Sequence, residues 1–209
     1  MSNPRRISKL LSLMLRHRSE EFGLEVDEYG FVPLDEAVEA VQERYPEVEE
    51  KDILDLVEAP GQHRFEITEQ GIRALYGHSF FVEMDDEPVE PSEHLYMWCT
   101  ARAARQFREQ GVHPADRYYV HLSLSRQVAE ERSRRLDDAC IVEILARRAH
   151  AEGIQFYSRG EVVLTREIPP EFVGEIAGLE SQGAHDGAEN ESREDVSYGR
   201  RPRPGTRRS

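Results

Sequence analysis

Apolar residues recur at helical spacing near the start of the chain, between Leu10 and Leu15. This pattern predicts an amphipathic helix that begins around Ser8 and is followed by a stop at Gly23. The basic residues near its C-terminal end are Arg16, His17 and Arg18. Cations at that position complement the helix dipole, so this stretch alone does not indicate a site.

The pattern over residues 1–80 predicts a helical unit closed by a small hairpin. Residues 24–32 alternate like an edge strand with a turn, and further helices are expected over 33–41 and 50–57. Two short strands, residues 63–67 and 72–76, flank a turn. Three helices plus a hairpin are typical of a winged helix, a common nucleic-acid-binding module.

An acidic, proline-marked stretch over residues 85–91 indicates a linker and a domain boundary. The chain then predicts a mixed unit, in which the alternation of the strand over 118–123 places Tyr119, His121 and Ser123 on one face. The other expected elements are strands over 96–100, 140–145, 156–157 and 162–164 and helices over 101–110 and 126–135. We therefore expect three parts: residues 1–84, residues 91–173, and a disordered tail over 174–209 that has almost nothing to bury.

The formal charge of −14 in 209 residues argues against non-specific nucleic-acid binding by the whole molecule. The charge is uneven, however: residues 36–58 and 83–93 are rich in carboxylates, whereas residues 102–135 are rich in arginine, which allows a local basic groove. No apolar run approaches the roughly 18 residues of a membrane helix, and we expect a cytoplasmic protein. Cys99 and Cys140 are best treated as core residues, and the sequence shows no metal-ligand spacing and no phosphate-loop fingerprint.

Three short stretches combine donors for phosphate or ribose oxygens with possible structural roles. The first, Arg73 with Gly77-His78-Ser79, suits an anion but on its own favours an ordinary surface turn. The second, residues 117–123, is equally compatible with a ligand-binding strand and with a half-buried structural histidine. The third, Ser133-Arg134-Arg135, is unremarkable as a solvated run.

Taken together and in order, these stretches resemble the NAD-dependent RNA 2′-phosphotransferase family over residues 7–173. The resemblance rests on the following matches: Ser8-Lys9 through Leu15-Arg16-His17, Gly23-Leu24 with residues 27–31, Arg64-Phe65-Glu66, Ile72-Arg73-Ala74, Gly77-His78-Ser79, Val120-His121-Leu122-Ser123, Arg134-Arg135, Gly153 with Phe156-Tyr157, and Val163-Leu164-Thr165 before Pro169-Pro170. It implies an α+β fold, with an N-terminal winged-helix RNA lobe followed by an ADP-ribosyltransferase-like NAD lobe that contains a small split β-sheet.

The resemblance also implies a reaction. An internal RNA 2′-phosphate attacks the nicotinamide ribose of NAD and nicotinamide leaves. The ribose 2″-hydroxyl then attacks the phosphate of this ADP-ribosylated RNA, which releases ADP-ribose 1″,2″-cyclic phosphate and a 2′-hydroxyl RNA. The implied partners are NAD as co-substrate and 2′-phosphorylated RNA, as in tRNA splicing, with no metal and no membrane; we expect a monomer.

The family's phosphate-binding tetrad maps onto Arg16, His17, Arg73 and Arg135. The residues implied to contact substrate phosphate are Gly77, His78, Ser79 and Arg134, and those implied to bind NAD are Trp98, Thr100, His121 and Ser123. Fixed guanidinium groups suit a phosphate whose charge must be spread as bonds change. Because an imidazole titrates near neutral pH, His17 could move a proton.

One departure from the family pattern leaves other functions open. The family has Leu-Tyr-His-Gly-Thr on the first strand of the NAD lobe, and here Trp98 and Cys99 stand in place of the histidine and glycine. An indole is far bulkier than an imidazole and donates only one hydrogen bond. The alternatives are an ADP-ribosyltransferase that modifies a nucleic-acid 5′-phosphate, and a noncatalytic RNA- or phosphate-binding relative that has lost the NAD pocket.

Overall fold

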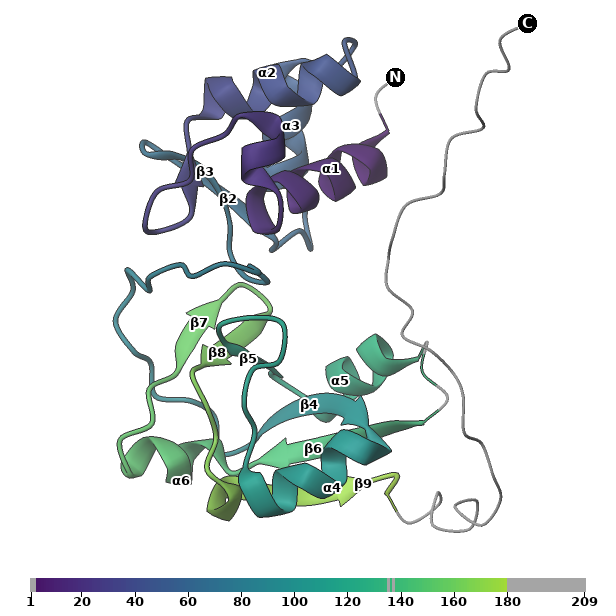
Figure 1. Cartoon of the computed structure of the whole chain (residues 1–209), viewed down its shortest axis with the longest axis vertical. Coiled ribbons are helices and arrows are strands. Elements are labelled where there is room, and N and C mark those ends of the chain that lie inside the picture. The colour runs from purple at the N-terminus through teal and green to yellow at the C-terminus, as the bar shows by residue number, and fades with distance from the viewer. Residues whose placement is uncertain (1–2, 135, 137, 180–209) are drawn as a thin grey trace, which may run out of the picture.

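The computed structural model describes residues 3–134, 136 and 138–179 of the chain. These residues form two units that are stacked along the long axis of the molecule and joined by one connecting segment, residues 75–94 (Figure 1). The described part contains six α-helices and two antiparallel sheets, which confirms the predicted α+β class.

The first unit packs three helices against a small sheet. Helix α1 (Pro4–Arg16) begins at Asn3, whose side chain accepts a hydrogen bond from the Arg5 amide, and it buries the apolar face that the sequence pattern predicts. The remaining helices and strands of the unit are the short η1 (Ser19–Phe22), β1 (Phe31–Val32), α2 (Leu34–Arg44), α3 (Glu50–Glu58), β2 (Phe65–Thr68) and β3 (Gly71–Ala74). The strand order is β1-β3-β2, so β3 is central.

Of the edge strand expected over residues 24–32, only Phe31–Val32 forms and pairs with β3, after the expected turn at residues 28–30. The Asp27 carboxylate explains the difference, because its Oδ1 accepts hydrogen bonds from the amides of Tyr29 and Phe31 at 2.9 and 2.7 Å. An aspartate that caps its own turn in this way competes with strand pairing.

The second unit is a six-stranded sheet in the order β7-β8-β5-β4-β6-β9, with helices on both faces. The elements are β4 (Leu95–Thr100), α4 (Ala101–Gln110), β5 (Val120–Ser123), α5 (Arg126–Ser133), β6 (Ala139–Ile144), α6 (Ala146–Ala151), β7 (Tyr157–Arg159), β8 (Val162–Thr165), η2 (Pro170–Phe172) and β9 (Val173–Ala177). Helices α4 and α6 cover the face that forms the main core. Tyr96, Trp98, His121 and Ser123 alternate onto the opposite face.

The C-terminal boundary differs from the expected one. The tail was expected to begin at residue 174, but Val173–Ala177 forms β9 and pairs with β6 at the edge of the sheet. The reason is that Ile176 is buried against the main core, so one inward side chain is enough to extend the sheet. Residues 180–209 of the expected tail lie outside the described residues.

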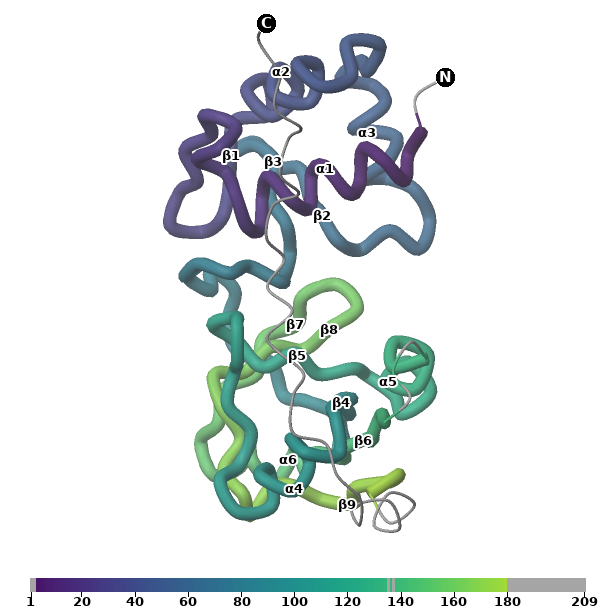
Figure 2. The backbone as a smooth tube through the Cα atoms, turned by 45° about the vertical axis from the view of Figure 1, so that its right-hand side comes forward, coloured from purple at the N-terminus to yellow at the C-terminus, as the bar shows by residue number. Residues whose placement is uncertain are grey.

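The two units and the connecting segment are in contact along a seam, through several interactions. The Tyr119 hydroxyl donates to the Val82 carbonyl at 3.2 Å. At the tip of the β7–β8 hairpin, which points towards the first unit in both views (Figures 1 and 2), Gly160 lies so close to His63 that an added Cβ would be 2.6 Å from the His63 carbonyl oxygen. The seam is therefore in direct contact rather than bridged by a loose linker.

No helix in the described part of the chain is long and apolar enough to cross a bilayer. Within the same residues, no group of three or more His, Cys, Asp and Glu side chains is arranged to hold a metal ion.

Candidate active site at the seam between the units

Arg16, the last residue of α1, is held at the seam by aromatic rings. Its guanidinium carbon lies 4.9 Å from the centre of the Tyr76 ring and 5.6 Å from that of Phe65, and Nη2 donates to the Arg64 carbonyl at 3.4 Å. Burial lowers its pKa to about 10, and its Nε is buried with no hydrogen-bond partner. No carboxylate among residues 3–179 that the structure describes pairs with Arg16. A buried, unneutralised cation of this kind favours an anionic ligand.

The segment Gly77-His78-Ser79 is bound to the end of α1. The amide and the hydroxyl of Ser79 both donate to the Arg16 carbonyl, at 2.9 and 3.2 Å, and so satisfy an oxygen that the helix leaves free. Gly77 has a φ of 91°, and an added Cβ would lie 3.4 Å from Arg16 Nη1. The structure therefore brings together two stretches that are some 60 residues apart in the sequence.

Three histidines surround Arg16. His78 and His121 line one small cavity with Gly77, and both have a buried Nε2 without a partner. Burial, followed by nearby arginines, lowers the pKa of His78 to about 3 and that of His121 to about 4. His17 is exposed, and desolvation with the charge of Arg117 lowers its pKa as well. All three rings are therefore neutral at pH 7 and can accept hydrogen bonds.

The positive charge of the site comes from arginines, two of which sequence reasoning did not place there. Arg64 and Arg117 are exposed, and both lower the pKa of Arg16 through their charges. The sequence placed Arg117 beside a strand suited to a ribose or a phosphate, and Arg64 in a short matching motif. No helical or strand periodicity, however, marks either arginine as facing Arg16. Three arginines at one point of a chain with a net charge of −14 make a local basic site.

Arg73 has a different environment. Its side chain is 5% exposed; Nε pairs with Glu66, and Nη1 donates to Asp85 at 2.7 Å and to the Tyr29 carbonyl at 3.2 Å. Arg159 of the second unit is also buried and pairs with the other oxygen of Asp85. We call Arg73, Asp85 and Arg159 the buried clamp. The structure thus pairs the Arg73 guanidinium with two carboxylates.

Of the residues that the resemblance implies bind NAD, three lie on one face of the second sheet: Trp98, His121 and Ser123. His121 Nδ1 donates to the Tyr119 carbonyl at 2.9 Å. The His121 ring meets the Tyr76 ring edge-on at 6.1 Å between centroids, which links β5 to the Arg16 cluster. Ser123 is buried on the same face, and the indole of Trp98 is 40% exposed there. Thr100 instead caps α4, since its Oγ1 accepts from the Ala103 amide at 3.3 Å.

The third basic stretch is only partly defined. Arg134 is exposed at the C-terminal end of α5, which lies over the His121 face of the sheet. Arg135 lies outside the described residues.

The profile of the "RNA 2'-phosphotransferase, Tpt1 / KptA family" matches residues 2–167. The chain belongs to the RNA 2′-phosphotransferase family. Relatives of the family named "Probable RNA 2'-phosphotransferase" include a protein of Thermococcus kodakarensis, 37% identical over 81% of this chain and 95% of its own length. Others are from Pyrococcus horikoshii (36%, 82% and 98%) and Rhizobium rhizogenes (34%, 84% and 95%). Membership of the RNA 2′-phosphotransferase family confirms the resemblance and makes the chain a member of a family of transferases.

Proposed function

We propose that this protein removes a 2′-phosphate from RNA and transfers it to NAD, with release of nicotinamide and ADP-ribose 1″,2″-cyclic phosphate. The observation that carries the proposal is the unneutralised cation cluster around Arg16, in a chain that belongs to the RNA 2′-phosphotransferase family. Such a cluster can hold a dianionic phosphate without a metal ion.

We assign the phosphate to Arg16, His17 and Arg64, with Arg117 as a further cation. The guanidinium of Arg16 is fixed between two rings, so it needs no reorganisation when the charge on the phosphate oxygens changes. The exposed ring of His17, neutral at pH 7, can accept a proton from a hydroxyl near the phosphate. Arg73 is assigned to the buried clamp and acts on the site only through the position of the two units.

The remaining expected phosphate contacts divide into three groups. The amide and the hydroxyl of Ser79 both donate to the Arg16 carbonyl, and Gly77 lies against the Arg16 side chain. We therefore assign Gly77 and Ser79 to positioning Arg16. His78 keeps a free Nε2 beside the cluster. Arg134 and Arg135 stay predictions as phosphate ligands.

The open face of the second sheet fits the ribose end of NAD. Because His121 Nδ1 donates to a carbonyl, its buried Nε2 is left as a hydrogen-bond acceptor, which suits a ribose hydroxyl. The exposed indole of Trp98 offers a stacking surface on the same face, and Ser123 lies beside His121 on that face. NAD would supply the ribose that accepts the phosphate and the nicotinamide that leaves.

We also propose that the first unit is a winged-helix lobe that binds RNA and the second an ADP-ribosyltransferase-like lobe that binds NAD. The three helices with a three-stranded sheet, and the free His121 acceptor, support these two assignments. A monomeric state, a cytoplasmic location and a role in tRNA splicing stay predictions.

One assay tests the function. The protein is incubated with NAD and an RNA that carries an internal 2′-phosphate, and the products are separated by chromatography. Cyclic phosphate of ADP-ribose is the expected product. ADP-ribose that persists on RNA, above all at a 5′-phosphate, would indicate the alternative transferase, and unchanged substrates would indicate a noncatalytic relative.

Two neighbouring arginines give a matched pair of variants for this assay. Arg16→Ala should lower kcat by about 10²–10³-fold, since it removes a fixed charged donor in a poorly solvated site. Arg18→Ala should leave kcat within about threefold, because Arg18 is exposed and pairs with Glu21 at 3.3 Å. Equal effects of the two substitutions would contradict the assignment of Arg16 to the phosphate.

A further inference from the structure

Two exposed aromatic rings form a pair beside the cation cluster. Phe81 is 47% exposed and Tyr118 is 51% exposed, although both are large apolar side chains. Their ring centres lie 5.7 Å apart with an angle of 69° between the planes. We call these two rings the seam pair. An edge-to-face pair of this kind leaves ring surface open to a third flat group.

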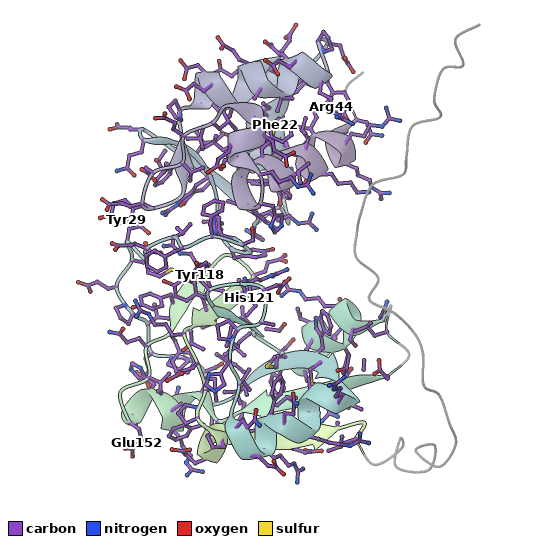
Figure 3. All side chains as sticks on the ribbon, in the orientation of Figure 1. Phe22, Tyr29, Arg44, Tyr118, His121 and Glu152 are labelled. Atoms are coloured by element: carbon purple, nitrogen blue, oxygen red, sulfur yellow. The ribbon has the colours of Figure 1, made fainter. Side chains whose placement is uncertain are left out.

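The backbone on both sides of the seam pair is anchored. Val82, which follows Phe81, accepts the hydrogen bond from the hydroxyl of Tyr119, which follows Tyr118. Tyr118 and His121 both project at the end of the second unit that faces the first (Figure 3). The seam pair is therefore held at a fixed place, so that less conformational entropy of the protein is lost when a ligand binds to it.

The chain segments that carry Phe81 and Tyr118 both adjoin the proposed phosphate site. Arg117 precedes Tyr118, and its charge lowers the pKa of both His17 and His121. Phe81 lines the same open groove as His17 and Ser79. A nucleotide whose phosphate lies on the arginines thus has the two rings within reach of its neighbour.

The charge of the groove limits what can lie there. Away from His17, the lining holds an ion pair between Arg18 and Glu21. The other carboxylates there, Glu20, Glu25 and Asp27, give this part of the groove a net negative charge, which repels phosphate groups. A ring face offers a base dispersion and stacking contacts that need no positive charge. Flat, uncharged nucleobases are therefore the chemical group that this part of the groove fits.

We propose that the seam pair binds the base of the nucleotide adjacent to the 2′-phosphate in single-stranded RNA, by stacking. This inference rests on the proposed function, because it places the reacting phosphate on the Arg16 cluster. Stacking requires an unpaired base, so the seam pair selects an unpaired junction or end over a duplex. Since every base has a π-face, it selects against duplex structure more than for one sequence.

The test uses the full-length protein without NAD and short fluorescent RNAs, with binding measured by anisotropy. One RNA carries an internal 2′-phosphate, and two others are identical except that the nucleotide on its 5′ or its 3′ side is abasic. We expect Phe81→Ala and Tyr118→Ala each to weaken binding of the complete RNA about tenfold, which corresponds to about 1.4 kcal/mol. One of the two abasic RNAs lacks the base that stacks on the seam pair. The same substitutions should change the affinity for that RNA by less than about twofold.

Conservative variants separate stacking from packing. Tyr118→Phe keeps the ring and should bind like the natural protein, whereas Phe81→Leu keeps an apolar side chain without a ring and should bind like Phe81→Ala. Thermal melting by circular dichroism checks that each variant is folded. The proposal would be overturned if the substitutions weakened the binding of the complete RNA and of both abasic RNAs equally. It would also be overturned if the affinity for RNA stayed the same and calorimetry showed a weaker affinity for NAD, because the rings would then be assigned to NAD.

A separate comparison isolates a failure of the proposed function. The natural protein should bind the 2′-phosphorylated RNA more tightly than the same RNA without that phosphate. Loss of this preference alone would contradict the phosphate site, while the difference between complete and abasic RNA would still report stacking on the seam pair.

Discussion

Replacing Asp85 by Asn removes the charge at the centre of the buried clamp with almost no change in shape. In the natural protein Asp85 accepts from Arg73 at 2.7 Å and pairs with Arg159, and these two arginines come from different units. Both arginine side chains are almost fully buried. The substitution therefore leaves two buried cations with less compensation.

The loss of stability in Asp85→Asn depends on the ion pairs that Arg73 and Arg159 keep. Breaking a fully buried pair by removing one partner costs about 3–5 kcal/mol. The cost here should be lower, because the Asp85 side chain is 28% exposed, Arg73 keeps Glu66 and Arg159 keeps Asp86 at 3.0 Å. We expect a loss of about 2 kcal/mol in the free energy of unfolding, or about 4–8 °C in melting temperature for a chain of this size.

The neighbouring Asp86 provides a control with the same chemistry. Its side chain is 50% exposed and pairs with Arg159 alone, so Asp86→Asn should cost no more than about 1 kcal/mol. Unfolding in urea, followed by circular dichroism and by the fluorescence of Trp98, measures both variants. If Asp85→Asn and Asp86→Asn lose the same stability within about 0.5 kcal/mol, the clamp does not hold the units together as we infer.

A double-mutant cycle and a pH titration check the same reasoning. In a protein that already carries Arg73→Met, the cost of Asp85→Asn should fall by about 1 kcal/mol, because one of the two lost contacts is then absent. Burial alone would raise the pKa of Asp85, but the hydrogen bonds from Arg159 and Arg73 outweigh it and lower the pKa. The contribution of Asp85 to stability is therefore present above its unfolded pKa and is lost as the pH falls through the folded pKa.

Three further predictions concern other parts of the seam. Gly160→Ala should cost clearly more stability than Gly23→Ala, because both glycines have positive φ but only Gly160 would place a Cβ 2.6 Å from the His63 carbonyl oxygen; equal melting temperatures would contradict the close approach. With the pKa of His121 lowered to about 4, the unfolded state binds a proton first as the pH falls, so stability should decline from about pH 6.5 to pH 4. His121→Gln should make that decline shallower in urea titrations, and the part that remains should come from His78, whose pKa is lowered to about 3. NAD should change the fluorescence of Trp98 saturably, and a flat titration after correction for absorption would remove NAD from that face.

Local pattern predicts the elements that bury one face. The alternation of residues 118–123 predicts β5, although the strand begins only at Val120. The helical spacing near the N-terminus predicts α1, because in both cases the buried side chains lie within a few residues of one another. Helix α6 and strand β9 escaped prediction, since each owes its place to the core of the second unit.

The site is harder to predict from the sequence, because residues far away in the chain determine which of its arginines form ion pairs. Arg73 and Arg64 both stand in short basic motifs, yet Glu66 and Asp85 neutralise the first, whereas the second remains exposed beside Arg16. No local periodicity distinguishes a paired arginine from a free one. The family resemblance drew attention to both stretches, but only the fold shows which arginine has a carboxylate partner.

The connecting segment has a role that its composition conceals. Its acidic and proline residues suggest a spacer, but it contributes Tyr76 and His78 to the cluster around Arg16 and Asp85 to the clamp, and its Val89 amide donates to the Phe156 carbonyl at 2.7 Å. Its length is therefore fixed by three attachments in series. Over evolution, insertions and deletions in this protein should accumulate elsewhere, and a fusion or split made at this apparent boundary would dismantle the site that the two halves share.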